Sequence, residues 1–343
     1  MKQQEKYIQR SIDLARNGLG STYPNPLVGA VIVHNGKIIG EGWHRKAGEA
    51  HAEINAINSV KDKSLFKESE IYVSLEPCSH YGKTPPCALK IIELGFKKVI
   101  VGALDPSDKV NGKGIELMKN AGIEVVTGIL GEKCKKLNKR FFTFHEKKRP
   151  YIFLKWAQSA DGFIDKNFQP FPISNAWAKQ FTHQMRAEEH SLLIGTKTAL
   201  TDNPSLTTRE VSGKNPIRIL IDFDLKVPRN FNIFNNEAKT FIFNSIKNLE
   251  EKNLKFIKIE RKNFLSQLMT ELHENQIQSV IVEGGRQTLQ SFIDENLWDE
   301  VFIIKNENLY LENGTPAPVF NYKHLKINTL NNKFIIFQHT NDN

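Results

Sequence analysis

Residues capable of metal chemistry are grouped in the first third of the chain. His51 is followed two residues later by Glu53, and Cys78 and Cys87 come further along with eight residues between them. One imidazole and two thiolates form a ligand set that zinc favours, and three protein ligands leave the fourth tetrahedral position open for water. Zinc makes such a water nucleophilic near neutral pH. The pattern therefore predicts one catalytic zinc ion bound by His51, Cys78 and Cys87.

Glu53 is expected to move protons rather than to bind the metal. Deamination requires a proton to pass from water to the departing nitrogen, and a carboxylate two residues beyond a ligand can act first as general base and then as general acid. Zinc nucleobase deaminases carry this histidine, glutamate and paired-cysteine pattern, with two residues between the cysteines. The alternative is that His51, Cys78 and Cys87 are unrelated residues, each buried or incidental. That is the usual situation for any one such residue, but it explains the three together less well. Cys134 has no ligand partner nearby and is interpreted as an ordinary cysteine.

A possible anion-binding turn lies in the second half of the chain. The apolar run 280–282 leads through Glu283, Gly284 and Gly285 into an expected helix, where free backbone amides could hold a pyrophosphate. Taken alone, a Gly-Gly turn from strand to helix more often serves tight packing than ligand binding. No Gly-x-Gly-x-x-Gly follows a strand here, so the sequence does not predict a Rossmann dinucleotide unit.

The elements that position these residues alternate between helical and extended patterns. Asn35-Gly36 is a strong hairpin signal between two extended segments, and Gly95 is expected to end a helix. This alternation predicts a three-layer α/β domain. The expected helices are 7–18, 52–60, 87–94 and 112–120, and the expected strands are 28–33, 37–40, 71–75, 99–103 and 123–126.

A domain boundary is expected at the polar segment 147–150, which ends in a proline and precedes a fresh strand at 151–156. We therefore divide the chain into domains 1–148 and 149–343. Its length agrees with this division, because chains of this size seldom fold around a single hydrophobic core. The second domain is expected to be a mixed α/β sheet. Its helices are expected at 174–189, 265–273 and 287–295, and its other strands at 192–194, 217–221, 240–243, 256–259, 280–282 and 301–304.

Composition excludes several classes of protein. Apolar residues make up 40% of the 343 residues and charged residues 25%, values that exclude wholesale disorder and a coiled coil. No apolar run is long enough to span a bilayer and no signal core follows Met1, so we expect a cytoplasmic protein without membrane contact. The net charge is +9, and its excess lies in residues 1–149. The basic stretch 133–149 is either a patch that attracts nucleic acid or phosphate, or a solvated helix face that runs into a linker.

Three segments of the first domain resemble the bifunctional deaminase/reductase family of riboflavin biosynthesis, the RibD type. They are 24–31 (PNPLVGAV), 51–53 (HAE) and 76–87 (EPCSHYGKTPPC), and the eight-residue cysteine spacing fits that family rather than tRNA or cytidine deaminases. The resemblance implies a cytidine-deaminase-like fold and the substrate 2,5-diamino-6-(5-phosphoribosylamino)pyrimidin-4(3H)-one. It also implies a substrate pocket lined by Asn25, His44, His80 and Lys83. An amide suits a heterocycle edge and a lysine suits the ribose phosphate.

Segments of the second domain resemble the reductase half of the same family, whose fold is similar to dihydrofolate reductase. They are 155–162 (KWAQSADG), 186–189 (RAEE), 195–198 (GTKT), 202–209 (DNPSLTTR) and 283–285 (EGG). The resemblance implies a catalytic-site role for Lys155. It further implies NADPH contacts at Gln158, Thr198, Asp202 and Gly285, and substrate contacts at Leu206, Arg209 and Glu283.

The segment 170–175 (PFPISN) departs from the Ser-x-Trp-Ile-Thr stretch that members of the family often carry. Ser174 is expected here only as a helix cap. Pro170 and Pro172 could contribute to nicotinamide seating through backbone atoms alone.

Together the residues and the resemblance predict a two-step enzyme. It would deaminate the phosphoribosylated pyrimidine at a zinc site and reduce the ribose of 5-amino-6-(5-phosphoribosylamino)uracil to a ribityl chain with NADPH. We expect a small-molecule substrate, no nucleic-acid partner and a homo-oligomer. Two alternatives are a tRNA or nucleoside deaminase with an accessory domain, and a non-catalytic module stabilised by zinc.

Overall fold

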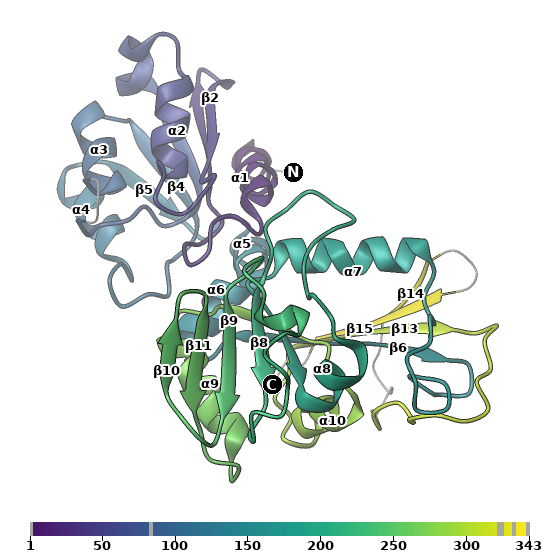
Figure 1. Cartoon of the computed structure of the whole chain (residues 1–343). Coiled ribbons are helices and arrows are strands. Elements are labelled where there is room, and N and C mark those ends of the chain that lie inside the picture. Colours follow the sequence, from purple (N-terminus) through teal and green to yellow (C-terminus); the bar gives the residue numbers. More distant parts are fainter. Residues whose placement is uncertain (1–2, 82–84, 321–325, 331–333, 341–343) are drawn as a thin grey trace. The chain divides into compact units, whose positions relative to one another are not determined.

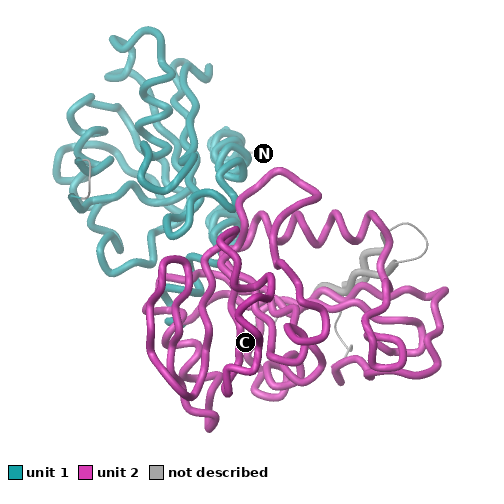
Figure 2. The backbone as a smooth tube through the Cα atoms, in the orientation of Figure 1, with its two compact units in different colours: residues 1–148 teal, residues 149–343 magenta. Residues whose placement is uncertain are grey.

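The computed structural model describes residues 3–81, 85–320, 326–330 and 334–340. The chain forms two compact units, residues 1–148 and 149–343, which Figure 2 shows in teal and magenta. Each unit has its own sheet and its own hydrophobic core. Among the described residues, no helix combines the length and the apolar character needed to cross a bilayer.

The sheet of the first unit has the strand order β2-β1-β3-β4-β5 among the described residues. β1 pairs antiparallel with both β2 and β3, whereas β3, β4 and β5 run parallel to one another. The β1–β2 hairpin turns at Asn35 and Gly36, whose positive φ angles of 47° and 74° suit the tight turn that the sequence predicted. The strands are β1 (Gly29–His34), β2 (Lys37–Trp43), β3 (Glu70–Leu75), β4 (Lys98–Ala103) and β5 (Glu124–Thr127).

Helices cover both faces of this sheet, which gives the expected three layers (Figure 1). One core joins alternate strand residues to α2 (Ala52–Ser59), α3 (Cys87–Leu94) and α4 (Lys113–Asn120). The other core joins the opposite residues to three further helices. These are α1 (Gln3–Ala15), α5 (Gly131–Leu137) and α6 (Lys139–Glu146). The unit also contains two short 3-10 helices, η1 (Arg16–Gly18) and η2 (Lys63–Glu68). The basic stretch 133–149 therefore lies largely on α5 and α6.

The sheet of the second unit has the order β10-β11-β9-β8-β7-β12-β6-β13-β15-β14 among the described residues. The strands from β11 to β13 in this order run parallel, and β10, β15 and β14 are antiparallel additions at the edges. The strands are β6 (Tyr151–Ser159), β7 (Ser191–Gly195), β8 (Ile217–Ile221), β9 (Thr240–Asn244), β10 (Leu249–Glu251), β11 (Leu254–Lys258), β12 (Ser279–Val282), β13 (Glu300–Asn306), β14 (Lys326–Leu330) and β15 (Phe334–Thr340).

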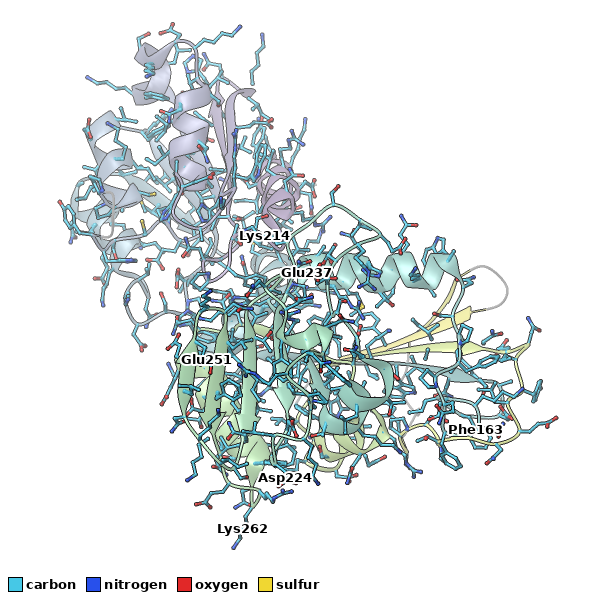
Figure 3. All side chains as sticks on the ribbon, in the orientation of Figure 1. Phe163, Lys214, Asp224, Glu237, Glu251 and Lys262 are labelled. Carbon is cyan, nitrogen blue, oxygen red and sulfur yellow. The ribbon has the colours of Figure 1, made fainter. Side chains whose placement is uncertain are left out.

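Parallel strands bring all their carboxyl ends to one edge of this sheet. Figure 3 shows the two edges: Lys214 and Glu237, which precede β8 and β9, lie at one, and Asp224 and Lys262, which follow β8 and β11, lie at the other. Helices again cover both faces. α7 (Ala176–Glu188), α8 (Thr196–Asp202) and η3 (Asn232–Phe234) cover one face, and α9 (Phe264–Glu274) and α10 (Arg286–Asp294) cover the other.

The start of α7 corrects one expectation from the sequence. Ser174 is not the cap: the N-cap is Asn175, whose side-chain oxygen accepts a hydrogen bond from the backbone N–H of Ala178 at 2.9 Å. The reason lies just before the cap, where the side chain of Ile173 is buried and its carbonyl accepts a hydrogen bond from Asn306. These contacts fix the backbone at Ile173, and the helix begins at Ala176, one residue later than it would with Ser174 as its cap.

Candidate active sites

The predicted zinc ligands come from three different places in the first unit. His51 is the residue before α2, Cys78 follows the end of β3, and Cys87 is the first residue of α3. β3 is a central strand of the sheet, and α2 and α3 lie on the same face of it. The fold therefore brings residues 9 to 36 positions apart in sequence to one point.

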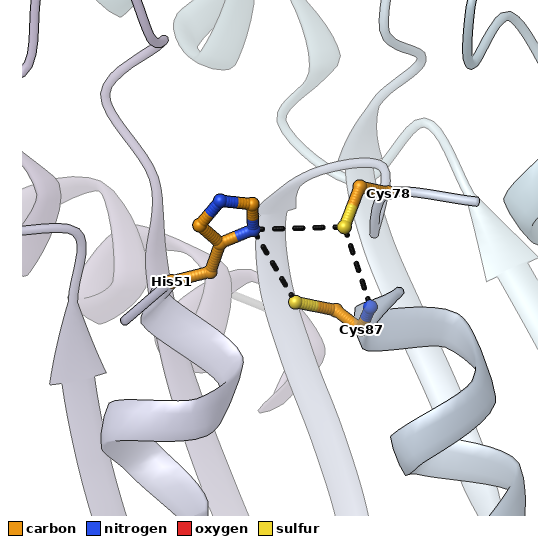
Figure 4. Close-up of side chains that lie close together, drawn as sticks. All are labelled: His51, Cys78 and Cys87. Carbon is orange, nitrogen blue, oxygen red and sulfur yellow. Dashed lines mark hydrogen bonds between the residues drawn. The ribbon is translucent and has the colours of Figure 1, made fainter. Parts of the chain in front are cut away.

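The three donor atoms face one another, as Figure 4 shows. His51 Nδ1 lies 3.6 Å from Cys78 Sγ and 3.4 Å from Cys87 Sγ, and all three candidate ligand atoms lie within 4.8 Å of one another. Cys78 Sγ also accepts a hydrogen bond from the backbone N–H of Cys87 at 3.3 Å. A tetrahedral ion needs ligand atoms converging in this way, so the donor set fits zinc.

The groups of this site shift one another's pKa values: the hydrogen bond to Cys78 raises the pKa of His51 to about 9, and the hydrogen bond to Cys78 also raises the pKa of Cys87. The neighbouring Cys87 thiol and the His51 imidazole lower the pKa of the Cys78 thiol, although burial opposes them, so that Cys78 is held as a thiolate. Burial raises the pKa of the Glu53 carboxyl to about 7, and this side chain lies beside Cys78 and Cys87 with 3% of its surface exposed. A buried carboxyl with a pKa near neutrality can both accept and release a proton.

The predicted pocket residues are partly assembled around this centre. The ring of His44 lies 5.3 Å from that of His51, and its Nδ1 donates to the carbonyl of Ala50 at 3.1 Å. Its Nε2 therefore accepts from the Asn25 amide at 3.0 Å, because burial lowers the pKa of His44 and keeps the ring neutral. His80 is exposed beyond Cys78, and Lys83 lies outside the described residues.

A second cluster forms at the carboxyl edge of the larger sheet. Lys155 on β6 lies 3.7 Å from Glu283, which follows β12, and Arg186 on α7 donates to the other oxygen of Glu283 at 2.5 Å. All three side chains have at most 14% of their surface exposed. Burial lowers the pKa of Lys155. Burial alone would raise the pKa of Glu283, but the positive charges of Arg186 and Lys155 have the larger effect, and the pKa of Glu283 is lowered.

The loop before β8 extends this cluster. The Arg209 guanidinium donates to the Thr207 hydroxyl at 3.2 Å, and its backbone N–H donates to His183 Nδ1 at 3.1 Å. The backbone carbonyl of Thr207 accepts a hydrogen bond from the Arg186 guanidinium at 3.5 Å. Leu206 is buried in the core beneath α7 and α8, so its side chain belongs to the packing under the loop.

The residues expected to contact NADPH lie along the same edge. The Thr198 hydroxyl on α8 accepts a hydrogen bond from the Gly285 N–H at 2.8 Å, which ties the turn before α10 to the helix after β7. A Cβ atom at Gly285 would come within 3.2 Å of that hydroxyl, so a larger residue here would require the Thr198 side chain to shift by a few tenths of an ångström. Gln158 accepts from the Trp156 indole at 2.7 Å, and Asp202 is exposed at the end of α8.

Sequence reasoning missed three contributors. Arg186 was noted only as part of a segment, yet it bonds Glu283 directly. The buried Arg218 donates to the carbonyl of Ser205 and to several carbonyls of the 232–238 loop, which anchors the loop that carries Arg209. Glu76, next to the Cys78 segment, is a buried carboxylate with four backbone partners. Glu76 and Arg186 begin the quoted segments 76–87 and 186–189 but were given no role there, and Arg218 lies in no quoted segment. Only an apolar setting for a charged residue could have suggested their contacts.

Comparison with known families matches both units. Residues 1–103 match the cytidine and deoxycytidylate deaminase zinc-binding region, and residues 150–306 match the RibD C-terminal domain. Among curated relatives, the riboflavin biosynthesis protein RibD of Aquifex aeolicus is 39% identical over 87% of this chain and 85% of its own length. RibD of Escherichia coli is 32% identical over 94% of this chain and 96% of its own length.

Solved structures agree over the whole chain. A diaminohydroxyphosphoribosylaminopyrimidine deaminase/5-amino-6-(5-phosphoribosylamino)uracil reductase from Thermotoga maritima has a TM-score of 0.88 and 34% identity, covering 98% of each chain. RibD of Acinetobacter baumannii has a TM-score of 0.84 and 31% identity, again covering 98% of each. These matches confirm the predicted α/β class, with a cytidine-deaminase-like unit followed by a reductase unit of the RibD type.

Proposed function

Because the chain belongs to the RibD family, the bifunctional deaminase/reductases of riboflavin biosynthesis, we propose that each of its units catalyses one of two consecutive steps. In this proposal residues 1–148 deaminate 2,5-diamino-6-(5-phosphoribosylamino)pyrimidin-4(3H)-one. Residues 149–343 then reduce the ribose of 5-amino-6-(5-phosphoribosylamino)uracil with NADPH. The observation that carries the proposal is the convergence of His51 Nδ1 with the sulfurs of Cys78 and Cys87 beside the buried Glu53.

The first site would work as a hydrolase on a cyclic amidine. His51, Cys78 and Cys87 would hold zinc, which when bound supplies the Lewis acidity that makes water nucleophilic near neutral pH. Glu53 would accept the proton that water loses and pass it to the amino nitrogen, which leaves as ammonia. Asn25 would orient the pyrimidine. Its amide nitrogen donates a hydrogen bond to His44, and its amide oxygen would accept a hydrogen bond from the pyrimidine. His80 and Lys83 are proposed to face the ribose phosphate.

The second site would hold a phosphosugar against a hydride donor. Thr198, Asp202, Gln158 and Gly285 are proposed to bind NADPH, which when bound supplies the hydride for the sugar C1 carbon. Reduction at C1 breaks the bond to the ring oxygen, so a proton must reach that oxygen. Lys155 is proposed to hold this proton, with Glu283 keeping its ammonium in place and Arg186 in turn holding Glu283. Arg209 would bind the phosphate, and Leu206 would support the loop that presents it.

Two assays on one preparation test the proposal. We expect one zinc per chain, ammonia release from the diaminopyrimidine, and NADPH oxidation only when the deaminated product is present. A protein that binds no zinc, or that oxidises NADPH without releasing ammonia from the first substrate, would contradict it. NADH in place of NADPH measures the cofactor preference.

The alternatives from the sequence are less favoured. A tRNA or nucleoside deaminase has no use for a RibD reductase unit, and a non-catalytic zinc module leaves the buried Glu53 without a role. The tRNA alternative predicts nucleic-acid affinity that falls steeply with salt, which a binding titration would detect. A cytoplasmic location and a homo-oligomer stay predictions.

A further inference from the structure

Glu76 is a buried charge with an unusual set of partners. It follows β3 directly, and only 4% of its surface is exposed. One carboxylate oxygen accepts from the backbone N–H of Gly112 at 2.9 Å and of Asp105 at 3.3 Å. The other accepts from Gly114 at 3.0 Å and Ile115 at 3.4 Å. Four backbone donors thus take the place of the water that burial removes.

These contacts attach the end of β3 to the start of α4. The N-cap position of α4 is Gly112, which has no side chain to cap the helix, and Glu76 supplies the missing acceptor from another part of the chain. The attachment is tight, because a Cβ atom added at Gly114 would lie 2.2 Å from the Pro77 carbonyl oxygen. Residues 76 and 77 are therefore held against α4 by both a side chain and the backbone.

Cys78, the next residue, is held from the opposite side. Its carbonyl accepts from the Ala88 N–H at 3.2 Å, and its sulfur accepts from the Cys87 N–H at 3.3 Å, both at the start of α3. The segment 76–78 thus crosses between two helix N-termini. The Glu76 backbone N–H also donates to the Ala103 carbonyl at 2.9 Å. If the α4 attachment loosened, that bond and the α3 contacts would remain to keep the Cys78 sulfur 3.6 Å from His51 Nδ1.

We propose that Glu76 is a positioning residue for Cys78, and that its carboxylate, by fastening β3 to α4, keeps the sulfur where zinc requires it. Glu76 touches neither the ion nor the substrate. Its effect passes through the backbone of Pro77 and Cys78. This inference rests on the zinc centre of the proposed function.

Zinc release from the full-length protein tests the role directly. Glu76→Gln keeps the shape of the side chain but turns an amide N–H group toward the backbone donors, so at least one hydrogen bond is lost. We expect the zinc-loaded variant to release its metal to a chromophoric chelator roughly ten-fold faster than the wild type. Glu76→Asp keeps the charge but shortens the reach, and we expect an intermediate rate. In cobalt-substituted protein, the sulfur-to-cobalt absorption of Glu76→Gln should shift as well.

A matched control separates positioning from general stability. Asn138, in the same unit, is 3% exposed and makes two hydrogen bonds of 2.8 Å to the backbone of Leu27. Asn138→Ala should lower the midpoint of urea unfolding without changing the rate of zinc release. Equal acceleration in Asn138→Ala and Glu76→Gln would overturn the proposal, as would wild-type release from folded Glu76→Gln.

A second variant covers the case in which Glu76→Gln does not fold. Gly114→Ala leaves the carboxylate intact but pushes the Pro77 carbonyl away from α4. We expect faster zinc release here too, and wild-type release from this folded variant would count against the proposal. If the wild type itself binds no zinc, the proposed function fails before the role of Glu76 is reached.

Discussion

At the scale of single residues, the first site separates metal binding from proton transfer. His51, Cys78 and Cys87 offer soft donors that converge on one point, whereas Glu53 lies next to them in a buried position with its pKa raised to about 7 by that burial. A ligand and a proton carrier placed two residues apart can therefore be removed independently by substitution.

Glu53→Gln is expected to retain zinc and to lose deamination. The amide has nearly the same shape but cannot carry the proton, so we expect ammonia release to fall by about 10² to 10⁴-fold. Metal content and ammonia release should be measured on the same sample, with NADPH oxidation of the deaminated substrate as an internal control. Loss of stoichiometric zinc, or near-normal turnover, would show that Glu53 has another role.

Arg209 and Lys155 are expected to affect different steps of the reduction. Arg209→Ala removes a guanidinium from the exposed loop and should weaken binding of the phosphosugar by about 1.5 to 3 kcal/mol while NADPH binding is retained. Lys155→Ala removes the buried ammonium beside Glu283 and should lower the single-turnover rate instead. Separate titrations of cofactor and substrate distinguish the two. Loss of NADPH affinity in Arg209→Ala would move this residue to the cofactor site.

At the scale of elements, α7 carries Arg186 into the second cluster from its last turn, whereas the cap of the helix lies at its opposite end. Its cap is Asn175 rather than Ser174. The local sequence offers both residues as good caps, and only the burial of Ile173 and the Asn306 contact decide between them.

Substitution of the two candidate caps tests this assignment. Asn175→Ala should lower the free energy of unfolding of the second unit by about 1 kcal/mol, because the Ala178 N–H loses its acceptor. Ser174→Ala is the matched control and should change the unfolding free energy little. Urea unfolding followed by circular dichroism measures both. A larger loss in Ser174→Ala than in Asn175→Ala would restore the expectation from the sequence.

Periodicity and turn signals predicted the elements that surround the sites better than the elements at the edges. α3 begins at Cys87 and ends before Gly95, and β8 spans 217–221, as the sequence indicated. α8 and the antiparallel strands β10, β14 and β15 were not expected. α8 and β10 are too short to carry much periodicity. Pairing with a neighbouring strand, rather than local pattern, decides such elements.

Site residues divide in a similar way. His51, Glu53, Cys78 and Cys87 were predictable because metal chemistry restricts both residue type and spacing. Glu76, Arg186 and Arg218 were not, since each acts through a partner far away in sequence, such as Glu283 for Arg186. Such pairs depend on the tertiary fold, which brings β12 and α7 to the same edge of the sheet.

At the scale of the whole molecule, each unit contains its own hydrophobic cores and its own cluster of candidate catalytic residues. The zinc ligands all come from residues 51–87, and the Lys155, Arg186 and Glu283 cluster comes entirely from residues 155–283. Their separate cores, on either side of residue 148, need share little stability. The two steps should therefore be separable in one intact chain.

Cys78→Ser in the full-length protein tests this independence. A serine hydroxyl is a poor replacement for a thiolate on zinc, so the variant should lose most of its metal and its deaminase activity. NADPH oxidation with pre-deaminated substrate should stay within about two-fold of wild type, because every residue of the second cluster is unchanged and its core is separate. Circular dichroism confirms that the second unit is folded. If reduction is lost together with the metal while that unit remains folded, the two sites depend on each other, and the assignment of one step to each unit is wrong.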